Sequence, residues 1–144
     1  MDCPGRIKIP YRWSAGRAGS AFLAALRDRA QFVGLRCPTC RKVSVPPRPH
    51  CPECRVAGTE WLDVGPRGTL VSWTVVREPA ATDVLPVPYA FATILLRGAD
   101  TALLHLIGET PFELLRAGLE LEPVFADARR GHMLDVKWFR TPRS

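Results

Sequence analysis

The chain has 144 residues, of which 47% are hydrophobic and 24% are charged. This composition is typical of one soluble globular domain of ordinary size, or of two very small ones, and it excludes a largely disordered chain. No apolar run approaches the roughly 18 residues that a membrane helix needs. The N-terminus also lacks the pattern of a secretory signal peptide, so we expect a cytoplasmic protein.

The formal net charge of +6 is unevenly distributed along the chain. Residues 1–60 contain eleven Lys and Arg side chains against four Asp and Glu, whereas the remainder contains nine against ten. A localised basic face favours an anionic partner, such as a nucleic acid, a phosphate-bearing ligand or an acidic protein surface. The alternative is that these arginines are solvated and reflect only a GC-rich coding sequence.

The first part of the chain predicts an arm and a short helix. Residues 1–19 contain scattered Gly, Pro and Arg without a period, and Cys3 lies alone among them. Ser20 is a suitable N-cap for a helix over residues 21–30. The apolar residues of that helix fall on one stripe: Phe22, Leu23 and Leu26. A helix of about ten residues is marginal alone, so we expect it to pack on the rest of the protein.

Two Cys-x-x-Cys pairs come after the helix, Cys37 with Cys40 and Cys51 with Cys54, and proline follows the first cysteine of each pair. This spacing is typical of two facing zinc knuckles, in which four thiolates bind one Zn²⁺ tetrahedrally and leave no open position for chemistry. Two disulfides are the alternative, which is disfavoured by the odd cysteine count and the missing secretory signal. His50 adjoins the second pair, but four cysteines already complete the coordination. We therefore predict a structural zinc ribbon.

Short strands are predicted next to the first knuckle, over residues 32–36 and 41–45, and residues 60–62 are expected to link the ribbon to the second half of the chain. Beyond residue 65 the pattern becomes strand after strand, with a proline-bracketed loop at 79–88 and a hairpin turn at 98–100. Five strands are predicted in this part of the chain: residues 68–76, 89–96, 101–107, 119–126 and 133–139.

One helical turn is predicted at 111–116, between the third and fourth of these strands. Five strands with such an insert suit a small Greek-key barrel of the OB type. The predicted fold is therefore mainly β, with an N-terminal helix, a four-cysteine zinc ribbon and a five-stranded OB-fold barrel. The expected organisation is an arm at 1–19, a helix with the ribbon at 20–60 and an OB-fold domain at 61–144.

Several short motifs accompany this order of parts: Phe22-Leu23-x-x-Leu26, Cys37-x-x-Cys40, Pro46-Pro47-Arg48, Cys51-Pro52-x-Cys54, Glu60-Trp61, the whole of strand 68–76 with its Ser72-Trp73-Thr74-Val75, Pro88-Tyr89 and Gly118-Leu119-Glu120-Leu121. Over roughly residues 20–140 this combination resembles the DUF35 family, zinc-ribbon and OB-fold proteins associated with acyl-CoA metabolism. The resemblance implies a non-catalytic partner of a thiolase-fold enzyme, a lipid-transfer-type aldolase or a hydratase in a hetero-oligomer. It also implies that CoA or acyl-CoA binds near the ribbon and the barrel.

Two features depart from the pattern of that family. Arg41 and Arg55 follow the second cysteine of each knuckle, where the family usually has glycine. Because glycine relieves a strained turn, each arginine would cost up to about 1 kcal/mol if its φ is positive. The segment Arg116-Ala117-Gly118-Leu119 also lacks the usual Ile-Gly-Met wording. Neither departure affects metal binding, but both affect any close approach of a ligand to glycine backbone.

Basic residues on the ribbon are the candidates for binding CoA, whose 3′-phosphate and pyrophosphate match arginine forks and lysine point charges. The candidates are Arg41, Lys42 and Arg48, with Arg36 and Arg55 as flanking positions. The alternative is that they are solvated loop charges. The aromatic residues Trp73, Tyr89 and Phe91 are expected either to line a pantetheine path or protein interface, or simply to belong to the core.

The sequence offers no constellation for catalysis by this chain alone. Four of the five cysteines are assigned to metal, and neither His105 nor His132 has an evident partner. Asp127 and Asp135 lack the paired spacing of acid–base residues. We therefore expect an accessory subunit of an acyl-CoA enzyme complex. A zinc-ribbon and OB-fold protein that binds single-stranded nucleic acid is the alternative, and the acyl group, partner reaction and stoichiometry stay undetermined.

Overall fold

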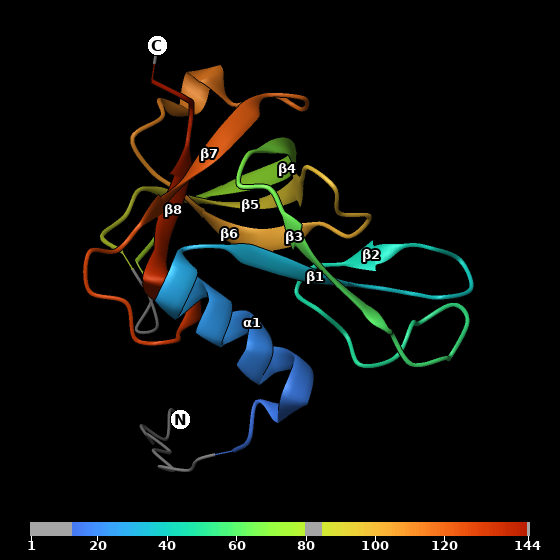
Figure 1. The fold of residues 1–144 in the computed structure, drawn as a ribbon. Coiled ribbons are helices and arrows are strands. Elements are labelled where there is room, and N and C mark those ends of the chain that lie inside the picture. The colour runs from blue at the N-terminus through green and yellow to red at the C-terminus, as the bar shows by residue number, and fades with distance from the viewer. Residues whose placement is uncertain (1–12, 80–84, 144) are drawn as a thin grey trace, which may run out of the picture.

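The computed structural model describes residues 13–79 and 85–143, which form one helix, a three-stranded sheet and a closed five-stranded barrel (Figure 1). The predicted fold class is thereby confirmed. Cys3, most of the predicted arm and the middle of the predicted 79–88 loop lie outside the described residues. Within the described ranges, no helix combines the length and the hydrophobicity needed to span a bilayer.

Helix α1 spans Gly16–Arg29 and therefore begins inside the predicted arm. The predicted N-cap was wrong, because Ser20 lies within the helix and Ala15 occupies the N-cap position without a side-chain hydrogen bond. Alanines on both sides of Ser20 favour the helical conformation and extend it towards the N-terminus. The C-cap of the helix is Ala30, whose left-handed backbone lets the next residue, Gln31, donate its N–H to the Ala25 carbonyl at 3.3 Å.

The three-stranded sheet places β1 (Phe32–Arg36) between β2 (Val43–Ser44) and β3 (Glu60–Val64), with both pairs antiparallel. Residues 60–62 were expected to be a link, but they are the first part of β3, which pairs with β1 along its full length. Strand β2 is shorter than the predicted 41–45, since Arg41 adopts a positive φ within the first knuckle. The sheet extends away from the barrel and has the two knuckle loops at its far end (Figure 1).

The barrel has the strand order β4-β5-β6-β8-β7 and closes through pairing of β4 with β7. All five predicted strands are present: β4 (Gly68–Val76), β5 (Tyr89–Leu96), β6 (Leu103–Ile107), β7 (Glu120–Phe125) and β8 (Val136–Arg140). The predicted helical turn is the 3₁₀ helix η1 (Phe112–Leu114). The last strand starts later than predicted, because Met133–Asp135 form a second 3₁₀ helix, η2.

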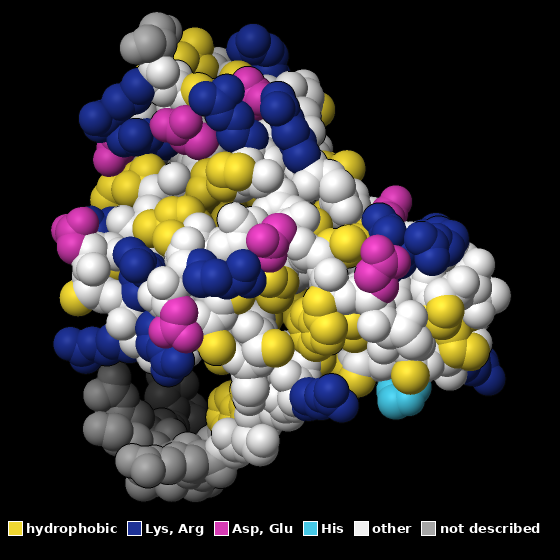
Figure 2. Space-filling view, in the orientation of Figure 1, with side chains coloured by type: hydrophobic (Ala, Val, Ile, Leu, Met, Phe, Trp, Pro, Cys, Tyr) yellow, Lys and Arg dark blue, Asp and Glu magenta, His cyan; other side chains and the backbone are white. Residues whose placement is uncertain are grey.

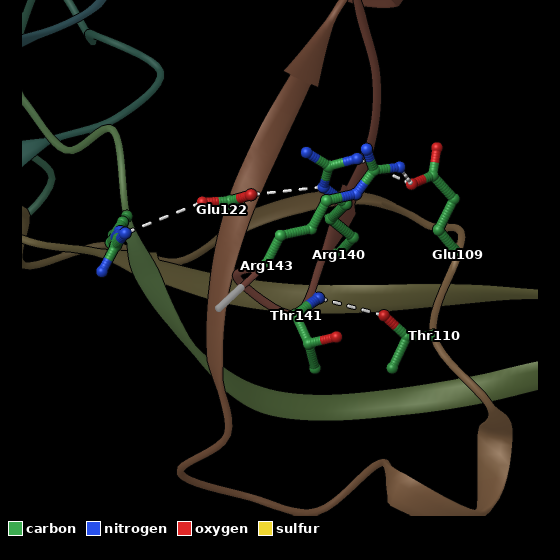
Figure 3. Close-up of polar contacts among 7 residues, drawn as sticks. Glu109, Thr110, Glu122, Arg140, Thr141 and Arg143 are labelled. Carbon is green, nitrogen blue, oxygen red and sulfur yellow. Dashed lines mark hydrogen bonds and ion pairs between the residues drawn. The ribbon is translucent and has the colours of Figure 1, made fainter.

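Charged side chains reinforce the junction at which β6 and β8 run parallel and pair at one register position. Arg140 of β8 lies between Glu122 of β7, at 3.2 Å, and Glu109 in the loop after β6, at 2.7 Å (Figure 3). Its side chain is only 19% exposed, so these ion pairs are screened less by solvent than pairs at the surface. The following residues add contacts from Arg143 to Glu109 and from Thr141 N–H to Thr110 Oγ1 (Figure 3).

One hydrophobic core runs beneath the helix, the three-stranded sheet and the barrel. Phe32 of β1 is fully buried at its centre. Its ring lies 6.4 Å from that of Phe22 in α1, 5.7 Å from Phe125 in β7 and 5.9 Å from Phe139 in β8. The ribbon and the barrel therefore pack as one body.

Hydrogen bonds join β2 to the turn between β5 and β6. Val43 N–H donates to Asp100 Oδ2 at 2.8 Å, and Asp100 N–H donates to the Val43 carbonyl at 2.9 Å. Val45 N–H donates to Thr101 Oγ1 at 2.8 Å, and that hydroxyl donates to the Val45 carbonyl at 3.0 Å. These reciprocal bonds fix the ribbon against the end of the β5–β6 hairpin.

Candidate metal centre

The first knuckle is a tight turn that begins at Cys37. The Arg41 N–H donates to the Cys37 carbonyl at 3.1 Å, and the Cys37 N–H donates to the Lys42 carbonyl at 2.9 Å. Arg41 adopts a φ of 65°, in the left-handed region that favours glycine. The turn closes only because this residue reverses the chain direction.

The second knuckle repeats the same pattern fourteen residues later. The Arg55 N–H donates to the Cys51 carbonyl at 2.9 Å, and the Cys51 N–H donates to the Val56 carbonyl at 2.9 Å. Arg55 has a φ of 57°. Both arginines that stand in place of glycine therefore have a positive φ, and the backbone strain expected at these two positions is present.

Four cysteine sulfurs meet where the two knuckles face each other. The Sγ atoms of Cys37, Cys40, Cys51 and Cys54 all lie within 4.8 Å of one another, and Cys40 Sγ is 3.7 Å from Cys51 Sγ. Zinc–sulfur bonds of about 2.3 Å in a tetrahedron place the sulfurs about 3.8 Å apart. All four cysteines are free thiols, so the alternative of two disulfides is wrong. His50 lies instead in an isolated β-bridge with Ala57.

The chemistry of this donor set calls for a cation. The backbone N–H of Cys40 lowers the pKa of the Cys37 thiol to about 6. A hydrogen bond with the Cys40 side chain, together with burial, raises the pKa of the Cys54 thiol to about 12. Four adjacent thiols cannot all ionise without a compensating positive charge, and a divalent metal supplies that charge. The site therefore fits Zn²⁺ held by the four thiolates, with no ligand position left open.

The structure brings two of the predicted CoA-binding residues to one place. Lys42 and Arg48 both line a cavity of about 90 Å³ between the ribbon and the β5–β6 turn, where Cys37 and Cys51 form part of the wall. Glu53 also lines this cavity and forms an ion pair with Lys42.

The other three predicted residues do not line that cavity. Arg36 pairs with Glu60 at 3.0 Å, and Arg41 lies 3.6 Å from the same carboxylate. Arg55 is exposed on the second knuckle. Figure 2 shows that basic side chains on this side of the molecule are interspersed with acidic ones and do not form one continuous basic surface.

Sequence reasoning missed Asp100 and Thr101, which line the cavity and carry the hydrogen bonds to β2. Their position in a hairpin turn is visible from the sequence, but nothing local indicates that a ribbon more than 50 residues earlier packs against them. Glu53 and Glu60 are two of the few acidic residues in a basic segment of the sequence. Their presence could have indicated that some of the neighbouring basic residues form ion pairs.

Two of the residues considered for catalysis, His105 and Asp135, have structural contacts. His105 is buried, its Nε2 lies 3.2 Å from the Met133 carbonyl, and burial lowers its pKa. Burial would raise the pKa of Asp135, but hydrogen bonds from the N–H groups of Arg130, His132 and Gly131 outweigh it, so this pKa lies below its ordinary value. Both side chains hold the loop between β7 and β8.

The three aromatic candidates on the barrel have different surroundings. Tyr89 is buried and meets Phe91 edge to face, with ring centroids 5.5 Å apart. Trp73 is exposed on β4. Tyr89 therefore belongs to the packed interior, and Trp73 is available at the surface.

Comparison with known proteins gives consistent matches to both parts of the chain. Residues 25–60 match the family model of the rubredoxin-like zinc ribbon domain of ChsH2, and residues 61–126 match that of its C-terminal OB-fold domain. A DUF35 domain-containing scaffold protein of Pyrococcus furiosus is 28% identical over 105 residues, which cover 73% of this chain and 76% of that protein.

Two solved structures share the fold. An Ltp2–ChsH2(DUF35) aldolase superposes with a TM-score of 0.68 at 20% identity, covering 90% of this chain and 98% of that one. A DUF35 protein of unknown function from Sulfolobus solfataricus has a TM-score of 0.63 at 21% identity, covering 76% of this chain and 78% of that one. These two proteins therefore have the same arrangement of ribbon and barrel as this chain.

Replacing one metal ligand tests the structural role of the cluster. We expect Cys54→Ser to lose zinc and to unfold the ribbon, because metal binding supplies the folding free energy of such modules. Zinc content by mass spectrometry and hydrogen exchange of residues 36–59 measure the two effects. Cys3→Ser is the matched control and should retain both. A ribbon that stays protected in metal-free Cys54→Ser protein would contradict the assignment.

The positive φ at the second knuckle predicts that glycine is the better residue there. We expect Arg55→Gly to stabilise the zinc-loaded protein by up to about 1 kcal/mol, or about 3 °C in Tm, because glycine adopts this conformation without strain. Arg48→Gly, at a ribbon arginine whose φ is not positive, should instead be neutral or destabilising. Equal Tm changes in the two variants would show that the left-handed conformation is not the cause.

Proposed function

The chain belongs to the DUF35 family of zinc-ribbon and OB-fold proteins, and we propose that it acts as a non-catalytic accessory subunit of an acyl-CoA enzyme complex. The partner is a thiolase-fold enzyme, an aldolase or a hydratase. The names of two similar proteins support this role, since one is a scaffold protein and the other is an Ltp2–ChsH2(DUF35) aldolase. Reduced zinc-binding thiols fit a cytoplasmic location.

The contacts of the titratable residues support a non-catalytic role. A general acid or base needs a side chain that reaches a substrate. His105 is instead buried against the Met133 carbonyl, and the Asp135 carboxylate accepts three backbone hydrogen bonds. The four cysteines of the ribbon are gathered at the metal centre. The chemistry therefore belongs to the partner.

The observation that carries the CoA part of the proposal is the convergence of Lys42 and Arg48 on the cavity between ribbon and barrel. A lysine and an arginine suit a phosphate group, and Glu53 would exchange its contact with Lys42 for solvent when a phosphate binds. A cavity of about 90 Å³ is far smaller than the 300–1,000 Å³ typical of complete small-molecule sites. It therefore accommodates a phosphate group, and the rest of CoA lies against the enzyme subunit.

Binding of single-stranded nucleic acid is the alternative function. An OB groove for single strands combines a basic track with stacking aromatics. Strands β4, β5 and β6 of this barrel contain no Lys or Arg. These three strands thus lack the cations that would follow a phosphate backbone, and the accessory role is favoured.

The accessory role predicts a stable complex with an acyl-CoA enzyme. We expect the chain to co-purify with a tagged thiolase-fold, aldolase or hydratase subunit encoded beside it when the two are co-expressed, since scaffold proteins act through such assemblies. Size-exclusion chromatography with light scattering gives the stoichiometry. If the chain elutes alone beside each of these enzymes, the proposal fails.

Charge reversal at the cavity tests the CoA contact within that complex. We expect the double variant Lys42→Glu, Arg48→Glu to weaken CoA binding about a hundredfold or more, because each of the two lost charge-assisted hydrogen bonds contributes about 1.5–3 kcal/mol. Titration calorimetry with CoA measures the affinity, and zinc content should not change. Arg77→Glu with Arg116→Glu, which alters the net charge equally on the barrel, is the control. Equal weakening in both doubles would indicate only long-range electrostatics.

A further inference from the structure

One side of the barrel is free of charge. Strands β4, β5 and β6 are neighbours in the barrel and contain no Asp, Glu, Lys or Arg, although 24% of the chain is charged. The other two strands differ, because β7 carries Glu120 and Glu122, and β8 carries Lys137 and Arg140. Charged residues are mostly found on exposed surface, so a solvent-facing side of a barrel normally carries some of them. The absence of charged residues is therefore confined to the side of the barrel formed by β4, β5 and β6.

The strand register defines which side chains face outwards here. Ala90, Ala92 and Ile94 of β5 are buried, so the intervening residues of β5 lie on the outer face. Two rows of paired residues cross this face: Ser72 with Thr93 and Leu104, and Thr74 with Phe91 and Leu106. Leu104 is 62% exposed, the highest exposure of any leucine among the described residues.

The loop between β7 and β8 extends this surface. Met133 and Leu134 of η2 line a shallow groove of about 170 Å³ together with Phe91, Leu104 and Leu106. Leu134 is 46% exposed. The loop is held beneath by the contact of His105 with the Met133 carbonyl and by the hydrogen bonds to Asp135. Leu134 is thus presented in a fixed position, which lowers the entropic cost of binding.

The chemistry of this surface, which we call the neutral barrel face (Ser72, Thr74, Phe91, Thr93, Leu104 and Leu134), fits a protein partner. The centres of protein interfaces are depleted in charge and contain aromatic and aliphatic anchors. OB folds commonly use the face of their second and third strands, here β5 and β6, to bind ligands. Nucleic acid is disfavoured because the face offers no cation to a phosphate.

The net charge argues against a second copy of this chain as the occupant. At +6, two copies repel each other, and such a charge favours the monomer over self-association. An acidic protein is attracted instead, and a neutral one is not repelled. The face also leads towards the CoA cavity, since Leu104 follows the cavity residue Thr101 by three residues, at most about 11 Å of extended chain.

We propose that the neutral barrel face is the surface that docks on the enzyme subunit, through a patch of the enzyme that is apolar and uncharged at its centre and acidic at its rim. This inference rests on the proposed accessory function and assigns the surface that performs it. A subunit docked there lies beside the cavity that contains Lys42 and Arg48 and completes the CoA site.

The test uses an aspartate placed at the centre of the face. Leu104→Asp and, separately, Leu134→Asp should each weaken the complex with the co-expressed enzyme subunit about tenfold or more, since an unpaired charge would be buried at the interface. Leu114→Asp is the matched control, because Leu114 is about as exposed as Leu134, at 48% against 46%, but lies on η1 and does not line the groove. Affinity is measured by biolayer interferometry, after Tm and zinc content have confirmed that each variant is folded.

The outcomes separate this inference from the function on which it rests. Loss of binding in Leu104→Asp and Leu134→Asp, with Leu114→Asp unchanged, supports the neutral barrel face. A complex that forms equally well with all three variants overturns the inference and leaves the accessory function intact. A wild-type chain that forms no complex overturns both. Wild-type dimers in sedimentation that Leu104→Asp dissociates would identify a second copy as the occupant and also overturn the inference.

Discussion

The burial of Phe32 is the interaction on which the arrangement of the molecule depends. Its ring contacts aromatic rings from the helix and from two barrel strands, so three parts of the chain share one core. A ribbon of this size cannot bury enough apolar surface to fold alone without its metal. Strand β1 therefore carries one end of the ribbon into the core of the barrel, while the metal closes the other end.

Because the ribbon is held at both ends, the cavity between ribbon and barrel has fixed walls. Val43 and Val45 bind the turn at Asp100 and Thr101 through four hydrogen bonds, and the adjacent knuckles are fixed by the cysteine cluster. Lys42 and Arg48, which are both exposed, thus line the same small cavity. Rigid supporting elements of this kind are what the proposed binding of a phosphate group requires.

The parts of the fold that could be predicted from the sequence are those specified by local patterns. Cysteine spacing predicted the four-cysteine cluster, and alternating or β-branched runs predicted all five barrel strands. Strand β3 was missed because its partner β1 lies about 28 residues earlier, and its Glu60 and Asp63 resemble those of a surface link. The start of α1 was missed because glycines at 16 and 19 suggest irregular chain. Long-range contacts, such as those of Asp100, leave no local signal.

The arginines that replace glycine at the two knuckles are explained by a comparison of magnitudes. A left-handed backbone at a non-glycine residue costs about 1 kcal/mol, whereas structural zinc binding contributes about 10–16 kcal/mol in such modules. The metal therefore imposes positive φ values on Arg41 and Arg55 at a cost the ribbon tolerates. The ribbon therefore folds with arginine at both positions because the backbone strain is a small fraction of the free energy of zinc binding.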